Sequence, residues 1–269
     1  MLRGLFLAAM CLFWPCAAMA DETVDRLAHA LRLEEVVEIL REEGLRYGQD
    51  LDQQLLENSG GVLFEDRVRQ IYSPAFMSES LRTALRDGLT KSQREQASLF
   101  FESELGQTII ALENSARRAI SDPEVLEMAK ARYEESDRSS SFYLLVDEYV
   151  RVNDLVQQNF EGGLVADFLF FQGMVEGRGA LGDEGAMISS MLANEDARRK
   201  ETEDWLFSFL MMAYRPLSDA DMRESIAFSR TDAGRSLNEA LFDGFDKMYV
   251  RMHYELGHAV GSAMAASDL

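Results

Sequence analysis

The sequence predicts an all-α protein, either a helical bundle or a helical-repeat array made of two related units packed together. Only four of the 269 residues are proline, and beyond residue 20 there is almost no β-type alternation of apolar and polar residues. Two stretches, FFESELG at 100–106 and FSRTDAG at 228–234, share one pattern. Four apolar residues recur on one helix face among charged neighbours: Leu33, Val36, Val37 and Leu40.

Residues 1–20 predict a secretory signal peptide. Arg3 precedes an uncharged apolar run, and Ala18-Met19-Ala20 forms an A-x-A cleavage site directly before Asp21. The run is too short to span a bilayer. A lipoprotein signal would instead place an acyl group on Cys16, but the bulky residues before this cysteine do not suit that processing. We therefore expect a periplasmic or secreted protein with no integral membrane segment after cleavage.

Charge and cysteine content exclude several functions. The chain has 27 basic and 47 acidic residues, a net charge of -20, and such a surface repels phosphate backbones and anionic lipid headgroups. We therefore expect no nucleic-acid partner. Both cysteines, Cys11 and Cys16, lie in the predicted leader, which leaves no thiol for a disulfide, a nucleophile or a metal cluster. Stability must come from packing, for which a chain that is 47% hydrophobic is ample.

The two seven-residue stretches predict matching corners, each a helix, a sharp break and another helix. The second stretch begins 128 positions after the first. In each one the phenylalanine can be buried, the hydroxyl can cap the following turn, and the tight backbone of that turn suits glycine. The residues at equal spacing are Phe100, Ser103 and Gly106 in the first copy, and Phe228, Thr231 and Gly234 in the second.

Helix-start signals support the same correspondence. Thr90 with Gln93, and Ser218 with Asp221, predict a capping box ahead of each corner. Farther along the chain, the stretch Trp205-Leu206-Phe207-Ser208-Phe209-Leu210-Met211-Met212 is apolar nearly all round and predicts a helix buried on several sides.

The chain beyond the leader divides into a first helical unit at 21–138 and a second at 139–269, joined by a polar stretch. A weaker echo relates 50–54 to 154–158, and its offset predicts extra residues in the second unit. We assign them to a loop at 173–185, which is rich in glycine. Units that cannot bury their apolar faces alone gain by stacking, so we expect the two to pack together.

The pattern F-x-x-S-x-x-G on a helical hairpin behind a signal peptide resembles a family of exported bacterial proteins known only as a domain of unknown function, whose typical motif is close to FYRSPLG. The resemblance implies a helical, periplasmic fold and brings no catalytic residues. The first copy matches the motif at four positions and the second departs from it at two: Phe100, Ser103, Leu105 and Gly106 match, whereas Thr231 and Ala233 depart.

The candidates for a chemical site are His253, Glu255 and His258 in the stretch HYELGH. The two histidines lie five residues apart, which turns them about 140° from each other on a helix, so they do not readily share a metal. The stretch is not an H-E-x-x-H motif, and the chain has no phosphate-binding loop, nucleophile elbow or EF-hand. We therefore predict no cofactor and no metal, and the sequence leaves any catalytic residue unknown.

Methionine is concentrated in the second half, where it can fill a core, form an adaptable groove for a partner helix or bind Cu(I). The second unit also carries most of the large aromatic residues, so we expect a groove or a self-association surface on this unit. We expect an exported helical binding or assembly protein of unknown ligand, whose partner is another protein or a second copy. The alternative is a periplasmic enzyme of unrecognised class, with a cleft near the C-terminal histidines. The methionines are Met174, Met187, Met191, Met211, Met212, Met222, Met248, Met252 and Met264, and the aromatic residues are Phe168, Phe170, Phe171, Trp205, Phe207 and Phe209.

Overall fold

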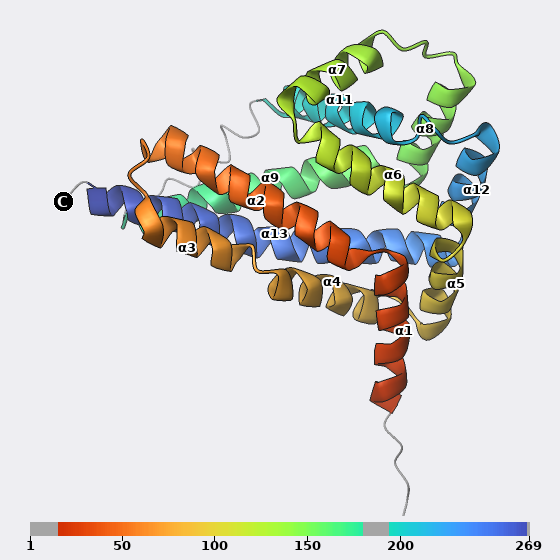
Figure 1. The fold of residues 1–269 in the computed structure, drawn as a ribbon, viewed down its shortest axis with the longest axis horizontal. Coiled ribbons are helices and arrows are strands. Elements are labelled where there is room, and N and C mark those ends of the chain that lie inside the picture. The colour runs from red at the N-terminus through yellow and green to blue at the C-terminus, as the bar shows by residue number, and fades with distance from the viewer. Residues whose placement is uncertain (1–15, 180–193, 268–269) are drawn as a thin grey trace, which may run out of the picture.

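The computed structural model describes residues 16–179 and 194–267, and in these ranges the regular structure is helical with no strand (Figure 1). The all-α prediction is therefore confirmed. Of the expected signal peptide, residues 1–15 lie outside the described ranges, and residues 16–20 form the first part of α1. No helix in the described part of the chain has both the length and the apolar character needed to cross a membrane.

Seven helices make up the described part of the first half of the chain. Two of them begin with proline at the first helical position, where the fixed φ suits a helix and the missing N–H costs no hydrogen bond. The helices are α1 (Cys16–Ala30), α2 (Leu33–Leu55), α3 (Gly61–Ile71), α4 (Pro74–Gly88), α5 (Lys91–Phe101), α6 (Glu104–Ile120) and α7 (Pro123–Glu134).

The described part of the second half contains α8 (Ser141–Val152), α9 (Leu155–Gly177), α11 (Glu195–Ala213), α12 (Asp219–Ser229) and α13 (Asp232–Ser267). The predicted loop at 173–185 is wrong over its first five residues, because α9 continues to Gly177. Gly173 and Gly177 are helical and pack against α13. The rest of that prediction falls mostly on residues 180–193, which lie outside the described ranges.

Both predicted capping boxes are confirmed. The Thr90 hydroxyl accepts the Gln93 amide and the Gln93 side chain accepts the Thr90 amide, at 3.3 and 2.8 Å. Ser218 and Asp221 make the same pair of bonds at 3.2 and 2.9 Å. The helices that follow these boxes, α5 and α12, are each 11 residues long.

Other helices in the two halves also correspond. Helices α2 and α9 each have 23 residues, and each follows a residue in the left-handed conformation, Arg32 at φ 49° and Asp154 at φ 50°. The expected echo between 50–54 and 154–158 does not fit this correspondence, because Asp50 lies within α2 whereas Asp154 directly precedes α9. The residues of this echo are similar in sequence, but they occupy different positions relative to α2 and α9.

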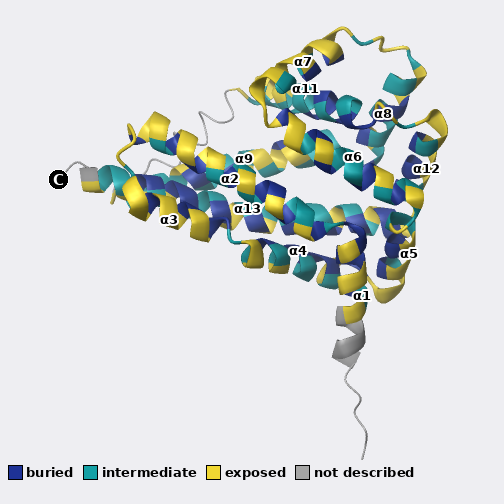
Figure 2. Cartoon of the chain, in the orientation of Figure 1, coloured by how far each residue is buried: buried dark blue, intermediate teal, exposed yellow. Residues whose placement is uncertain are grey.

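The core consists of two clusters, and each draws on both halves of the chain. The first cluster is formed mainly by α1 to α5 together with α13, and the second by α6, α7, α8, α11 and α12. Figure 1 shows α13 beside α4 and α9, and Figure 2 shows buried residues on the inward faces of the helices. The ranges 21–138 and 139–269 therefore do not coincide with the two cores, because their last helices are exchanged.

Helices α9 and α13 run side by side at very close range. A Cβ atom on Gly257 would lie 1.9 Å from the carbonyl oxygen of Phe170, and one on Gly173 would lie 2.2 Å from the carbonyl oxygen of Tyr254. Gly177 and Gly261 extend this contact by one turn on each helix. Four glycines thus allow the two backbones to touch, in the way that small residues do in tightly packed helix pairs.

Candidate functional site

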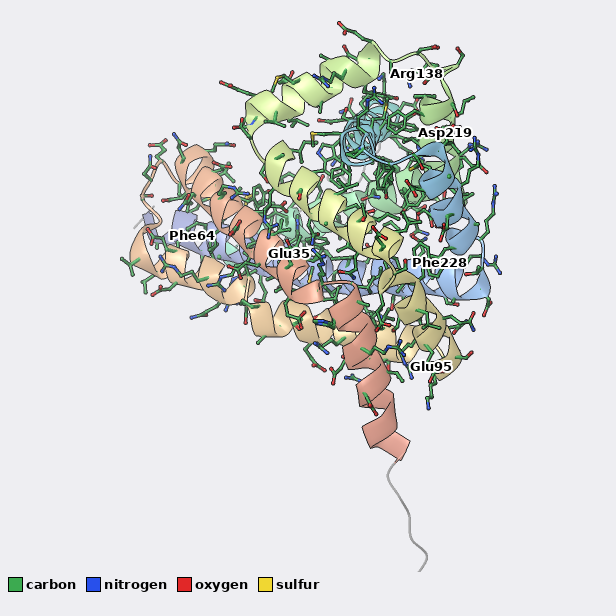
Figure 3. The ribbon with its side chains drawn as sticks, turned by 45° about the vertical axis from the view of Figure 1, so that its right-hand side comes forward. Glu35, Phe64, Glu95, Arg138, Asp219 and Phe228 are labelled. Carbon is green, nitrogen blue, oxygen red and sulfur yellow. The ribbon has the colours of Figure 1, made fainter. Side chains whose placement is uncertain are left out.

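The two predicted corners lie against each other. The rings of Phe100 and Phe228 are stacked, with centroids 4.0 Å apart and planes inclined by 2°. Phe101 packs edge-on against both rings, at 5.0 and 5.5 Å. Figure 3 labels Phe228 where α12 meets α13, next to α5 and α6. The repeated phenylalanines thus join the two halves.

Both corners use the same hydrogen bonds. The hydroxyl between the helices accepts the amide of the motif glycine and donates to the carbonyl of the motif phenylalanine. For Ser103 the partners are Gly106 at 3.1 Å and Phe100 at 2.6 Å, and for Thr231 they are Gly234 at 3.0 Å and Phe228 at 2.7 Å.

The motif glycines are required for close approach. Gly106 and Gly234 lie within helices and neither has a positive φ, so the expectation that the turn itself needs glycine is wrong. A Cβ would lie 2.3 Å from the Phe100 oxygen at Gly106, and 2.1 Å from the Phe228 oxygen at Gly234. In the structure these six motif residues build the corners.

A small cavity of about 130 Å³ lies beneath the corners and is lined by a half-buried acid, Glu113. The Tyr214 hydroxyl donates to its Oε1 at 2.5 Å, and the ring of Tyr149 packs edge-on against Tyr214. Burial raises the pKa of Glu113, and the hydrogen bond from Tyr214 opposes this only in part. The cavity is too small for most ligands, so we expect Glu113 to affect the stability of the fold and not to bind a ligand.

Replacing Glu113 with glutamine is expected to flatten the dependence of stability on pH. Because the folded protein raises the pKa of Glu113, its contribution is fully present below the unfolded pKa of about 4.3 and is lost as pH rises through the folded pKa. Between about pH 4 and about pH 8, urea denaturation should show the wild type losing more of its free energy of unfolding than the variant does. Glu224→Gln, at an exposed position on α12, is the control, and equal pH dependence in the two variants would contradict the role of Glu113.

The three sequence candidates His253, Glu255 and His258 occupy different places. His253 lines a groove; burial lowers its pKa, and its Nδ1 has no partner among the described residues. Glu255 instead pairs with Arg251 at 2.8 Å and Arg67 at 3.3 Å. His258 is exposed. The structure therefore does not bring the three into one cleft, and the described residues include no cluster of three or more potential metal ligands.

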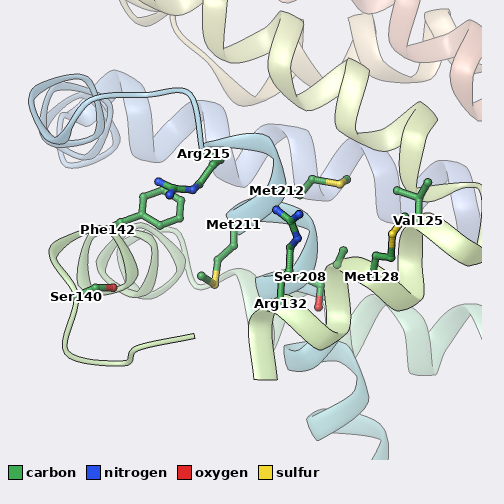
Figure 4. A pocket seen from close by; sticks show the side chains of 10 residues that line it. Val125, Met128, Arg132, Ser140, Phe142, Ser208, Met211, Met212 and Arg215 are labelled. Atoms are coloured by element: carbon green, nitrogen blue, oxygen red, sulfur yellow. The ribbon is translucent and has the colours of Figure 1, made fainter. Parts of the chain in front are cut away.

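A cavity of about 540 Å³ lies between α7, the start of α8 and α11, and we call it the methionine groove (Figure 4). Met128, Met211 and Met212 supply flexible apolar side chains, and Met128 is 59% exposed. The described lining residues are Val125, Met128, Ala129, Arg132, Ser140, Phe142, Ser208, Met211, Met212 and Arg215.

Among the described residues, the charged side chains that line the methionine groove are two arginines. Arg132 and Arg215 are exposed, and neither forms an ion pair with another described residue. The Arg215 guanidinium lies 5.6 Å from the ring centroid of Phe142. The groove is therefore apolar and positively charged on a protein whose net charge is -20.

Sequence reasoning found part of this groove. A methionine groove was one of three roles considered for the late methionines, and Met211 and Met212 do line one. Met128, Arg132 and Arg215 were not anticipated, because α7 and α11 are far apart in sequence. The one available signal in the sequence was position: Arg215 lies three residues after Met212, the last residue of the apolar stretch.

Residues 75–135 match the model of a family described as an uncharacterized protein conserved in bacteria (DUF2059). The match supports the resemblance to a bacterial domain of unknown function. It covers most of α4 and all of α5 to α7, which includes the first corner and the α7 side of the methionine groove. No curated protein and no solved structure matches the chain.

Proposed function

We propose that this chain is an exported helical binding protein that holds an amphipathic anion, an aliphatic chain with a carboxylate head, in the methionine groove. One observation carries the proposal: in the part of the chain that the structure describes, the charged residues lining this apolar cavity are Arg132 and Arg215, although the chain as a whole is strongly acidic. Guanidinium groups bind carboxylates through paired hydrogen bonds, and thioethers adapt to an aliphatic chain.

The size of the groove favours a small ligand over a protein partner. Its volume of about 540 Å³ falls within the range of roughly 300–1,000 Å³ that is common for small-molecule sites. A stable protein interface covers about 800 Å² on each partner, which is far more than ten lining residues provide. Protein binding and self-association are therefore secondary candidates.

Two further parts of the proposal concern where the protein is located and how its two halves arose. Export to the periplasm or the medium is supported by the leader-like composition of residues 1–20. Duplication of a helical unit is supported by the matching capping boxes, the matching corners and the equal lengths of α2 and α9. The enzyme alternative has less support, because its three candidates lie apart.

Decanoate is expected to bind the protein more tightly than decanol, which has the same chain without the charge. The double variant Arg132→Gln, Arg215→Gln should weaken decanoate binding by about tenfold to a hundredfold and leave decanol binding nearly unchanged, because each lost charged hydrogen bond costs about 1.5 kcal/mol or more. Isothermal titration calorimetry below the micelle concentration measures both affinities.

The matched control is the double variant Arg69→Gln, Arg223→Gln, which removes the same charge from exposed ion pairs on α3 and α12. Equal loss of decanoate binding in both double variants would mean that net charge, and not the groove, is responsible. Failure of decanoate to bind the wild type would overturn the proposal.

A further inference from the structure

A second groove has the opposite charge character. It has a volume of about 460 Å³ and lies between α9 and α13, with Arg117 of α6 and Trp205 of α11 on its walls. We call it the aromatic groove, because four large rings line it: Trp205, Phe242, Phe245 and Tyr249. We propose that the aromatic groove binds an organic cation, an amine held between the carboxylate of Asp246 and these rings.

Asp246 provides an unpaired carboxylate in the groove. It is half-buried and makes no hydrogen bond or ion pair with another residue in the described part of the chain. Gly162 leaves room for it, since a Cβ there would lie 2.7 Å from Asp246 Oδ1. Burial raises the pKa of Asp246, and the nearby carboxylates of Asp243 and Glu161 raise it further. A bound cation would stabilise the charged form of Asp246 against both burial and the neighbouring carboxylates.

The basic groups around the groove are already paired. Arg117 is held by Glu43 through two bonds of 2.9 Å, and Lys247 binds Asp243 at 2.6 Å. Arg198 bonds to Asp167, which also lines the groove. Because burial lowers the pKa of His253, its ring is neutral at neutral pH. None of these groups neutralises Asp246.

The rings supply the other half of the site. Phe245 and Tyr249 are stacked with centroids 6.2 Å apart, and Trp205 is stacked on Phe209 at 5.5 Å, which fixes the orientation of each ring. The faces of aromatic rings attract cations, and they do so more strongly where water is excluded. A carboxylate together with fixed rings therefore selects a cationic amine over a neutral or anionic ligand of the same shape.

The experiment uses Trp205 as its probe. Trp14 and Trp205 are the only tryptophans, so in the full chain carrying Trp14→Phe the indole fluorescence comes from Trp205 alone, and the Asp246 variant below ties the signal to the aromatic groove. Phenethylamine, phenethyl alcohol and phenylacetate share one aromatic body and differ in charge. We expect phenethylamine to change the fluorescence with an affinity at least about tenfold higher than that of the other two.

Asp246→Asn removes the charge and keeps the shape. It should reduce phenethylamine affinity by about tenfold or more. The control is Asp50→Asn, at an exposed position on α2, which should leave the affinity unchanged. Circular dichroism melting of each variant shows that it is folded. Equal affinity for the three probes, tighter binding of phenylacetate, or an unchanged affinity in Asp246→Asn would each overturn the proposal. The test is independent of the methionine groove, whose lining shares no residue with this one.

Discussion

Neither residues 21–138 nor residues 139–269 are expected to fold when expressed alone. The core around α1 to α5 is completed by six side chains of α13 that are each at most 4% exposed: Leu237, Ala240, Met248, Met252, Leu256 and Val260. Losing that burial costs the first fragment on the order of 10 kcal/mol, which is comparable to the whole stability of a typical domain. The second fragment loses α6 and α7 from its own core in the same way.

Circular dichroism and thermal denaturation measure this directly. Each fragment should lack a cooperative unfolding transition, whereas the two fragments expressed together should associate and recover one. The break between them falls at an exposed connection between α7 and α8, so the cut itself disturbs no buried contact. A cooperative transition in either fragment alone would show that the exchanged helices are dispensable.

Gly257→Ala is expected to destabilise the protein by about 2 kcal/mol or more, although alanine favours a helix over glycine by about 1 kcal/mol. The new methyl group would lie 1.9 Å from the Phe170 carbonyl oxygen, so α9 and α13 would have to separate. Backbone atoms cannot move aside as a flexible side chain does. Urea denaturation of the two proteins measures the difference in free energy of unfolding.

Gly163→Ala is the matched control. Gly163 lies in the interior of α9 and a Cβ there would meet no atom within 4 Å. This substitution should therefore stabilise the protein by about 1 kcal/mol through helix propensity alone. If both substitutions changed stability in the same direction and by the same amount, the close approach of α9 and α13 would not matter to the fold.

Local features of the fold were predictable from the sequence. The fold class followed from the spacing of residues such as Leu33 and Leu40, because helical periodicity is a property of neighbouring residues. The capping boxes at Thr90 and Ser218 and the breaks at both corners are equally local, and they lie where the sequence placed them. Hydroxyl caps act over three residues, so no distant contact can easily override them.

Features that depend on distant segments were not predictable. Nothing in the spacing of Phe100 and Phe228 shows that the two rings stack, and nothing in α13 shows which core it completes. The loop assigned to 173–185 was wrong at Gly173 because a glycine can serve a helix contact as well as a turn. Both grooves lie between helices that are far apart in sequence, so local sequence patterns do not predict them.

The exchange of α13 ties folding to the order of synthesis. During translation α1 to α5 appear first, but α13, which completes their core, begins only at Asp232, long after α5 ends at Phe101. Contacts between residues so far apart form slowly, and the growing chain cannot close that core early. If the proposed export uses an unfolded chain, this delay would keep the first core open while the chain is translocated.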